Sequence, residues 1–91
     1  MSGDGDPVSE IEVALEHAGR LCRNLLILEP HLTHQQVKKL AQWLYGCMNQ
    51  RYTIRRRVAE RGVGELPKAL EFFARACSAV LEIEEQVAGR E

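Results

Sequence analysis

Apolar residues recur at spacings of three and four along three long segments of the chain, which is the periodicity of amphipathic helices. In the first segment this pattern extends from about Pro7 to Leu28, and Pro30 disfavours helical backbone immediately after it. Asp6 can cap the helix, and Pro7 suits its first position because a missing N–H costs nothing there. The face that this helix should bury contains Ile11, Ala14, Leu15, Ala18, Leu21, Cys22, Leu25 and Leu28.

The second segment carries the clearest local signal in the chain. The Thr33 hydroxyl can accept from the Gln36 amide while the Gln36 side chain reaches back to Thr33, which is a capping box. We expect a helix over about residues 34–61, with Gly62 as a left-handed terminator. Thr53 can also start a separate helix, so a kink or break in the middle helix stays open. The expected buried face contains Val37, Leu40, Ala41, Leu44, Cys47, Met48, Ile54 and Val58.

A third periodic segment opens at Pro67 and reaches about Ala88. Its apolar face contains Leu66, Ala69, Leu70, Phe73, Ala76, Cys77, Val80, Ile83 and Val87. Three long helices joined by short connections pack against one another in alternating directions. We therefore predict an all-α fold, an antiparallel three-helix bundle, formed by a single helical domain over residues 1–91 with a flexible N-terminus over residues 1–6.

Composition agrees with one globular domain, since 91 residues that are 45% hydrophobic and 27% charged can bury one core. The longest apolar run, residues 25–28, is far shorter than the ~20 residues of a membrane span, so no membrane partner is expected. The acidic N-terminus does not resemble a secretory signal. An odd number of widely spaced cysteines, Cys22, Cys47 and Cys77, fits reduced thiols, so we expect an intracellular protein, cytoplasmic or nuclear.

Charge is distributed unevenly along the chain. The net charge is −1, but residues 1–32, 33–61 and 62–91 carry −4, +6 and −3. Most of the positive charge belongs to an arginine cluster within eleven residues, formed by Arg51, Arg55, Arg56, Arg57 and Arg61. Guanidinium groups bind phosphates and carboxylates, so this cluster is a candidate surface for an anionic partner, including a nucleic acid. Pairing with the acidic flanking helices is the alternative explanation.

Arg51 poses a specific question because a continuous middle helix directs it toward the inside of the bundle. An isolated charge there is costly unless it is paired. Either Glu16 or Glu84 meets it, or the helix breaks near Thr53 and Arg51 turns outward. Gly46 and Thr53 both loosen this stretch, so we expect the outward arrangement.

Four aromatic residues are the candidate partner-binding residues: Trp43, Tyr45, Tyr52 and Phe72. Such side chains dominate interface energies, and the broad apolar faces of the helices leave area for another protein or a second copy of the chain. Tyr45 and Tyr52 lie one heptad apart and therefore share a face.

Dedicated chemistry is not indicated by any motif. The sequence has no glycine-rich phosphate loop and no Ser/His/Asp order, and His31 and His34 lack neighbouring ligands for a metal. We therefore expect no catalytic, cofactor or metal site. The sequence favours a small protein-interaction module, a regulator or adaptor that presents an apolar and aromatic helical face and is able to self-associate. Nucleic-acid binding through the arginine cluster is the alternative.

Overall fold

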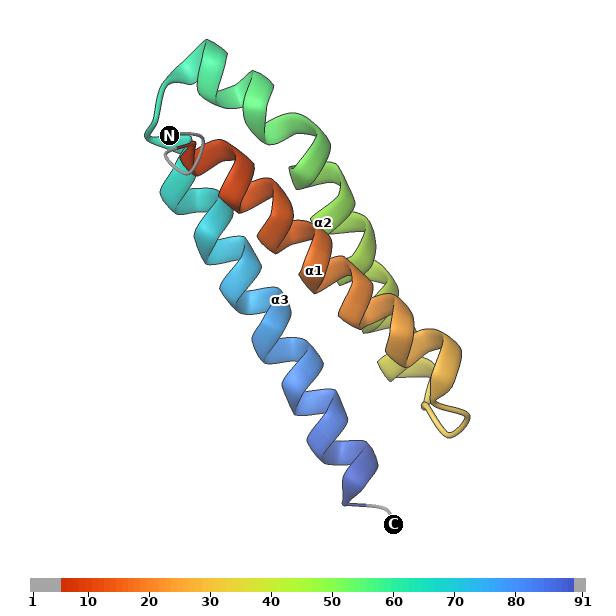
Figure 1. Ribbon diagram of the computed structural model, residues 1–91. Coiled ribbons are helices and arrows are strands. Elements are labelled where there is room, and N and C mark those ends of the chain that lie inside the picture. The colour runs from red at the N-terminus through yellow and green to blue at the C-terminus, as the bar shows by residue number, and fades with distance from the viewer. Residues whose placement is uncertain (1–5, 90–91) are drawn as a thin grey trace.

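The computed structural model describes residues 6–89 and consists there of three α-helices, α1 (Pro7–Leu28), α2 (His34–Arg61) and α3 (Glu65–Ala88). Figure 1 shows α2 running antiparallel to both α1 and α3. All three helices pack against one another, and α1 and α2 share the most extensive contact. The predicted antiparallel three-helix bundle is confirmed. Within residues 6–89, no helix is long and apolar enough to cross a lipid bilayer.

The first two helices begin at the residues that their capping signals predict. The Val8 amide donates to Asp6 Oδ1 over 3.1 Å, and the Ser9 hydroxyl donates to Asp6 Oδ2 over 2.7 Å. Asp6 is therefore the N-cap of α1, as its sequence predicts, and residues 1–5 of the predicted flexible N-terminus lie outside the described residues. At α2, the Gln36 amide donates to Thr33 Oγ1 over 3.1 Å and the Thr33 amide donates to Gln36 Oε1 over 2.9 Å, which confirms the capping box.

Helix α2 continues without interruption through all 28 of its residues, which confirms the helix predicted over about residues 34–61, and the alternative of a break near Thr53 is wrong. The Thr53 hydroxyl donates to the Asn49 carbonyl over 2.8 Å. Its hydrogen-bonding group is thus satisfied inside the helix instead of capping a new one. Helix α2 ends at Arg61 and is capped by Gly62, whose φ of +93° belongs to the left-handed region that glycine adopts without strain.

Helix α3 begins at Glu65, two residues earlier than the proline pattern predicts. Pro67 is the third helical residue, where its missing N–H is still harmless because the first four amides of a helix lack intrahelical partners. The nearly buried Glu65 carboxylate pairs with Lys68 Nζ at 3.1 Å and with Arg61 Nη1 at 3.8 Å. These pairs connect the end of α2 to the start of α3.

The hydrophobic core consists of two clusters along the bundle. The cluster toward the α2–α3 connection contains Val8, Ile11, Leu15, Ala18, Cys47, Ile54, Ala69 and Ala76. The second contains Cys22, Leu40, Val80, Ile83 and Val87, and Trp43 packs against both clusters. Five residues that we assigned to buried faces are exposed: Leu21, Leu28, Val37, Met48 and Leu70. Each helix has only two neighbours, so the edges of its apolar face remain in contact with solvent.

Candidate interaction surface

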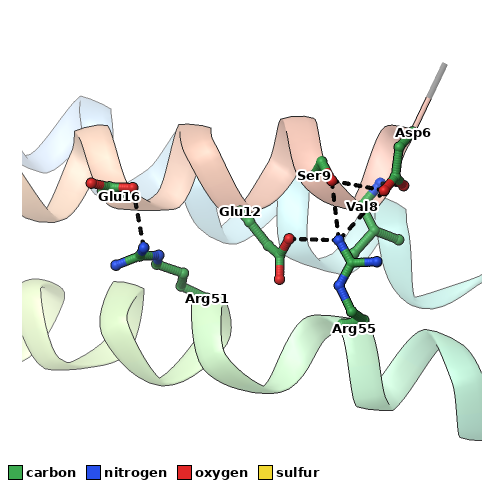
Figure 2. Close-up of polar contacts among 7 residues, drawn as sticks. All are labelled: Asp6, Val8, Ser9, Glu12, Glu16, Arg51 and Arg55. Carbon is green, nitrogen blue, oxygen red and sulfur yellow. Dashed lines mark hydrogen bonds and ion pairs between the residues drawn. The ribbon is translucent and has the colours of Figure 1, made fainter. Parts of the chain in front are cut away.

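Arg51 reaches from α2 to α1, where its Nη2 lies 3.3 Å from Glu16 Oε2 (Figure 2). The other oxygen of the same carboxylate pairs with Arg20 Nη2 at 3.1 Å. The expected outward arrangement is therefore wrong, and of the two partners considered, Glu16 is the one that meets Arg51. The Arg51 side chain is 39% exposed, so its charge lies at the solvent-facing edge of the helix contact and not inside the core.

Arg55 joins α2 to the first turn of α1 through several acceptors (Figure 2). Its Nη2 donates to Glu12 Oε1 over 2.8 Å, to Ser9 Oγ over 3.1 Å and to Asp6 Oδ2 over 3.4 Å. The hydrogen bond to Glu12 is the main reason that the pKa of Arg55 is raised. The Ser9 hydroxyl is the main reason that the pKa of the Asp6 carboxyl is lowered. Arg55 thus connects α2 to the capped N-terminus of α1 through hydrogen bonds.

The other members of the arginine cluster also have partners within the described chain. These contacts are Arg56 Nε with Glu60 at 3.8 Å, Arg57 Nη1 with Gln50 Oε1 at 3.1 Å, and Arg61 Nη1 with Glu65 at 3.8 Å. Two members of the cluster therefore contact α1, one contacts the start of α3, and two contact their own helix. The structure does not bring the five guanidinium groups together on one free surface.

Trp43 and Phe72 form a contact between α2 and α3. Their ring centroids lie 5.1 Å apart at an interplanar angle of 59°, and both rings are partly buried against the core. Phe72 also presses on Gly46, because a Cβ at that glycine would lie only 2.4 Å from Phe72 Cζ. These two predicted partner-binding residues therefore hold the bundle together.

Tyr45 and Tyr52, the other two candidates, point away from the core. Their exposed fractions are 70% and 69%, and Met48, which lies between them on the same helical face, is 42% exposed. The Arg51 guanidinium carbon lies 5.5 Å from the centroid of the Tyr52 ring, a cation–π contact. We call Tyr45, Met48 and Tyr52 the aromatic stripe.

Beside the aromatic stripe, two adjacent hollows follow the contact between α1 and α2, and we call them together the α1–α2 groove. Both hollows are lined by Glu16, Arg51 and Tyr52. The smaller, of about 240 Å³, is further lined by residues that include Arg20, Arg23, Leu44 and Met48. The larger, of about 440 Å³, is further lined by Ser9, Glu12, Val13 and Arg55.

Sequence reasoning did not identify this groove as a site. It placed Met48 on a buried face and gave no role to Val13. The hydrophobic pattern of a single helix does not determine how that helix packs against its neighbour. The available signal was the position of Met48, three residues after one tyrosine and four before the next. That spacing places all three side chains on one face.

The cysteines behave as small apolar residues. Cys22 and Cys47 are buried free thiols, and burial is the main cause that raises their pKa values to about 11 and about 12. Burial also raises the pKa of the half-buried Cys77. Among residues 6–89, no group of three or more His, Cys, Asp or Glu side chains is placed to hold a metal ion.

The fold and this surface define a three-helix bundle with one exposed aromatic stripe beside a charged groove. Comparison with known protein families, curated proteins and solved structures gives no match.

Proposed function

We propose that this chain is a small intracellular protein-interaction module, a regulator or adaptor, which binds its partner through the aromatic stripe. The observation that carries the proposal is the exposure of Tyr45, Met48 and Tyr52 in one line along α2. Such side chains gain free energy when a partner removes them from water. Tyrosine also provides a large contact area at a small cost in rotamer entropy, which suits a binding surface.

The composition of the α1–α2 groove supports binding rather than catalysis. Its described lining contains no histidine or cysteine, the residues that most often act as bases or nucleophiles. Its carboxylates are engaged, since Glu16 pairs with Arg20 and Arg51, and Glu12 pairs with Arg55. The three free cysteines support the intracellular location, because oxidising compartments favour disulfides.

The test is to isolate the partner from source cells with a tagged chain. We expect a partner to co-purify with the unmodified protein and to be lost with Tyr52→Asp, because a carboxylate there opposes burial of the stripe. Val63→Asp is the matched control, since Val63 is 71% exposed and lies in the α2–α3 connection. Circular dichroism should show the same helix content for all three proteins. Retention of every partner by Tyr45→Asp/Tyr52→Asp would refute the proposal.

Nucleic-acid binding through the arginine cluster receives less support from the structure. Each arginine of the cluster contacts a carboxylate or an amide of the chain. A nucleic acid would therefore have to displace these contacts. Titration of labelled DNA and RNA at two salt concentrations separates the two functions, because phosphate contacts make affinity fall steeply with salt.

A further inference from the structure

We propose that the α1–α2 groove binds an acidic amphipathic helix of a partner protein, which lies along α1 and α2 as a fourth helix of the bundle. This inference rests on the proposed function, and it adds the chemistry of the partner. It follows from three features of the groove: its charge, its apolar floor and its length.

The smaller hollow carries an excess of positive charge. Its lining contains three arginines, Arg20, Arg23 and Arg51, and a single carboxylate, that of Glu16. That carboxylate gives one oxygen to Arg20 at 3.1 Å and the other to Arg51 at 3.3 Å. Arg23 is exposed and makes no ion pair with a described residue. An incoming carboxylate therefore finds one unpaired guanidinium and two that share a partner.

In the larger hollow, by contrast, positive and negative charges are equal in number. Its carboxylates, Glu12 and Glu16, face two guanidinium groups, those of Arg51 and Arg55. Arg55 is already bonded to Glu12 and Ser9. The attraction for an acidic group is thus concentrated at the end of the groove that contains Arg23, which gives the bound helix a direction.

An apolar floor lies beside these arginines. Leu15 is fully buried beneath the smaller hollow, and Leu44, Met48 and Tyr52 line it. Its volume of about 240 Å³ is below the roughly 300–1,000 Å³ of typical small-molecule sites. The hollow therefore suits an apolar side chain that projects from a larger partner, with acidic residues of that partner next to Arg20 and Arg23.

The length of the groove suits a helix. Along α1 its lining runs from Ser9 to Arg23, which spans about 21 Å at the helical rise of about 1.5 Å per residue. Two antiparallel helices present a groove between their side-chain ridges, and an amphipathic helix binds such a groove with side chains at spacings of three and four. A partner helix of about four turns would cover both hollows.

A second copy of the chain is a poorer occupant. Its α3 does offer an exposed acidic surface, with Leu81 next to Glu84 and Glu85. However, no α3 residue lines either hollow, so the groove and the outer face of α3 point in different directions. Contacts between two different surfaces of identical chains grow into open-ended assemblies unless they close into a ring. A separate partner protein avoids this.

Two labelled synthetic helices test the proposal against the full chain by fluorescence anisotropy. Each has about 15 residues with leucines at spacings of three and four, and one carries glutamates beside the leucines at one end where its twin carries glutamines. We expect the glutamate peptide to bind about tenfold more tightly than its twin at low salt, and this difference should shrink as salt rises.

Charge reversal within the chain identifies where the glutamates bind. Arg23→Glu should weaken binding of the glutamate peptide by about tenfold and leave its glutamine twin nearly unaffected. Arg75→Glu is the matched control, because Arg75 is an exposed arginine of α3 that lies outside the groove, and it should change the affinity by less than about twofold. Tyr52→Ala should weaken both peptides, because Tyr52 lines both hollows.

Three results would overturn the inference: neither peptide binds, the two peptides bind equally well, or the two charge reversals have equal effects. Sedimentation of the chain alone tests whether a second copy of the chain occupies the groove. Open-ended association that is lost with Arg23→Glu would also overturn the inference. If a natural partner is lost with Tyr52→Asp but retained with Arg23→Glu, the proposed function stands and the acidic helix is wrong.

Discussion

Replacement of Gly46 by alanine should destabilise the protein, although alanine is the better helix former. Gly46 lies inside α2, where glycine to alanine normally stabilises by about 1 kcal/mol. Here the new Cβ would lie 2.4 Å from Phe72 Cζ, so the ring must retreat by about 1 Å to reach ordinary contact. The Trp43 ring, 5.1 Å away between centroids, restricts that movement.

The net effect follows from two opposing contributions. Overpacking of this kind costs about 1–3 kcal/mol, which exceeds the helix-propensity gain. We expect Gly46→Ala to lower the free energy of unfolding by about 1 kcal/mol and the melting temperature by about 4–8 °C for a domain of this size. In a Phe72→Leu background the obstruction is gone, so the same substitution should stabilise by about 1 kcal/mol. The coupling free energy between the two positions is then about 2 kcal/mol.

Thermal and urea denaturation of the four proteins of this double-mutant cycle measure the coupling. Gly19→Ala is the control, because Gly19 is also inside a helix but its nearest neighbours, Leu44 Cδ1 and Cys47 Cβ, would lie at ordinary distances of 3.6 and 3.7 Å from the new Cβ. That substitution should stabilise by about 1 kcal/mol. If Gly46→Ala stabilises the protein as much as Gly19→Ala does, the steric conflict between a Cβ at position 46 and the Phe72 ring is absent.

Two further predictions concern polar and sulfur-containing side chains. Arg51→Leu should lower the free energy of unfolding, measured in urea, by less than about 1 kcal/mol. The Arg51–Glu16 pair is more than a third exposed, and Glu16 keeps its ion pair with Arg20 on α1. A loss of about 3 kcal/mol or more would contradict this prediction. With a thiol-specific reagent at about pH 8, Cys77 should react before Cys22 and Cys47, because the thiolate is the reactive form of cysteine. Burial raises the pKa of Cys22 to about 11 and the pKa of Cys47 to about 12, so both remain protonated at this pH. Mass spectrometry of the labelled peptides checks the order, and equal labelling of all three would contradict it.

The helices themselves were predictable because their ends depend on local sequence. Asp6 with Pro7, and Thr33 with Gln36, act within one turn of the chain, and the structure places α1 and α2 where these signals indicate. The start of α3 was less predictable. A proline is compatible with several positions of the first turn, so Pro67 alone does not determine the first helical residue.

The roles of the aromatic residues were not predictable in the same way. Trp43 and Tyr45 both flank the expected apolar face of α2, on opposite sides. The flank of α2 that becomes buried is the one on the side where α3 packs against the α1–α2 pair. The hydrophobic pattern of α2 alone does not determine that side. The structure places Trp43 against Phe72 of α3 and leaves Tyr45 exposed. The direction of Arg51 was misjudged for a related reason, since its partner lies on another helix.

The position of Trp43 gives the protein an internal spectroscopic reporter. It is the only tryptophan of the chain, and its ring contacts both core clusters and Phe72. Its fluorescence emission therefore senses the approach of α3 to α2 at the junction of the two clusters, without any added label. Tyr45 and Tyr52 remain in water while this happens. The emission of one residue can thus follow assembly of the core separately from events on the exposed stripe.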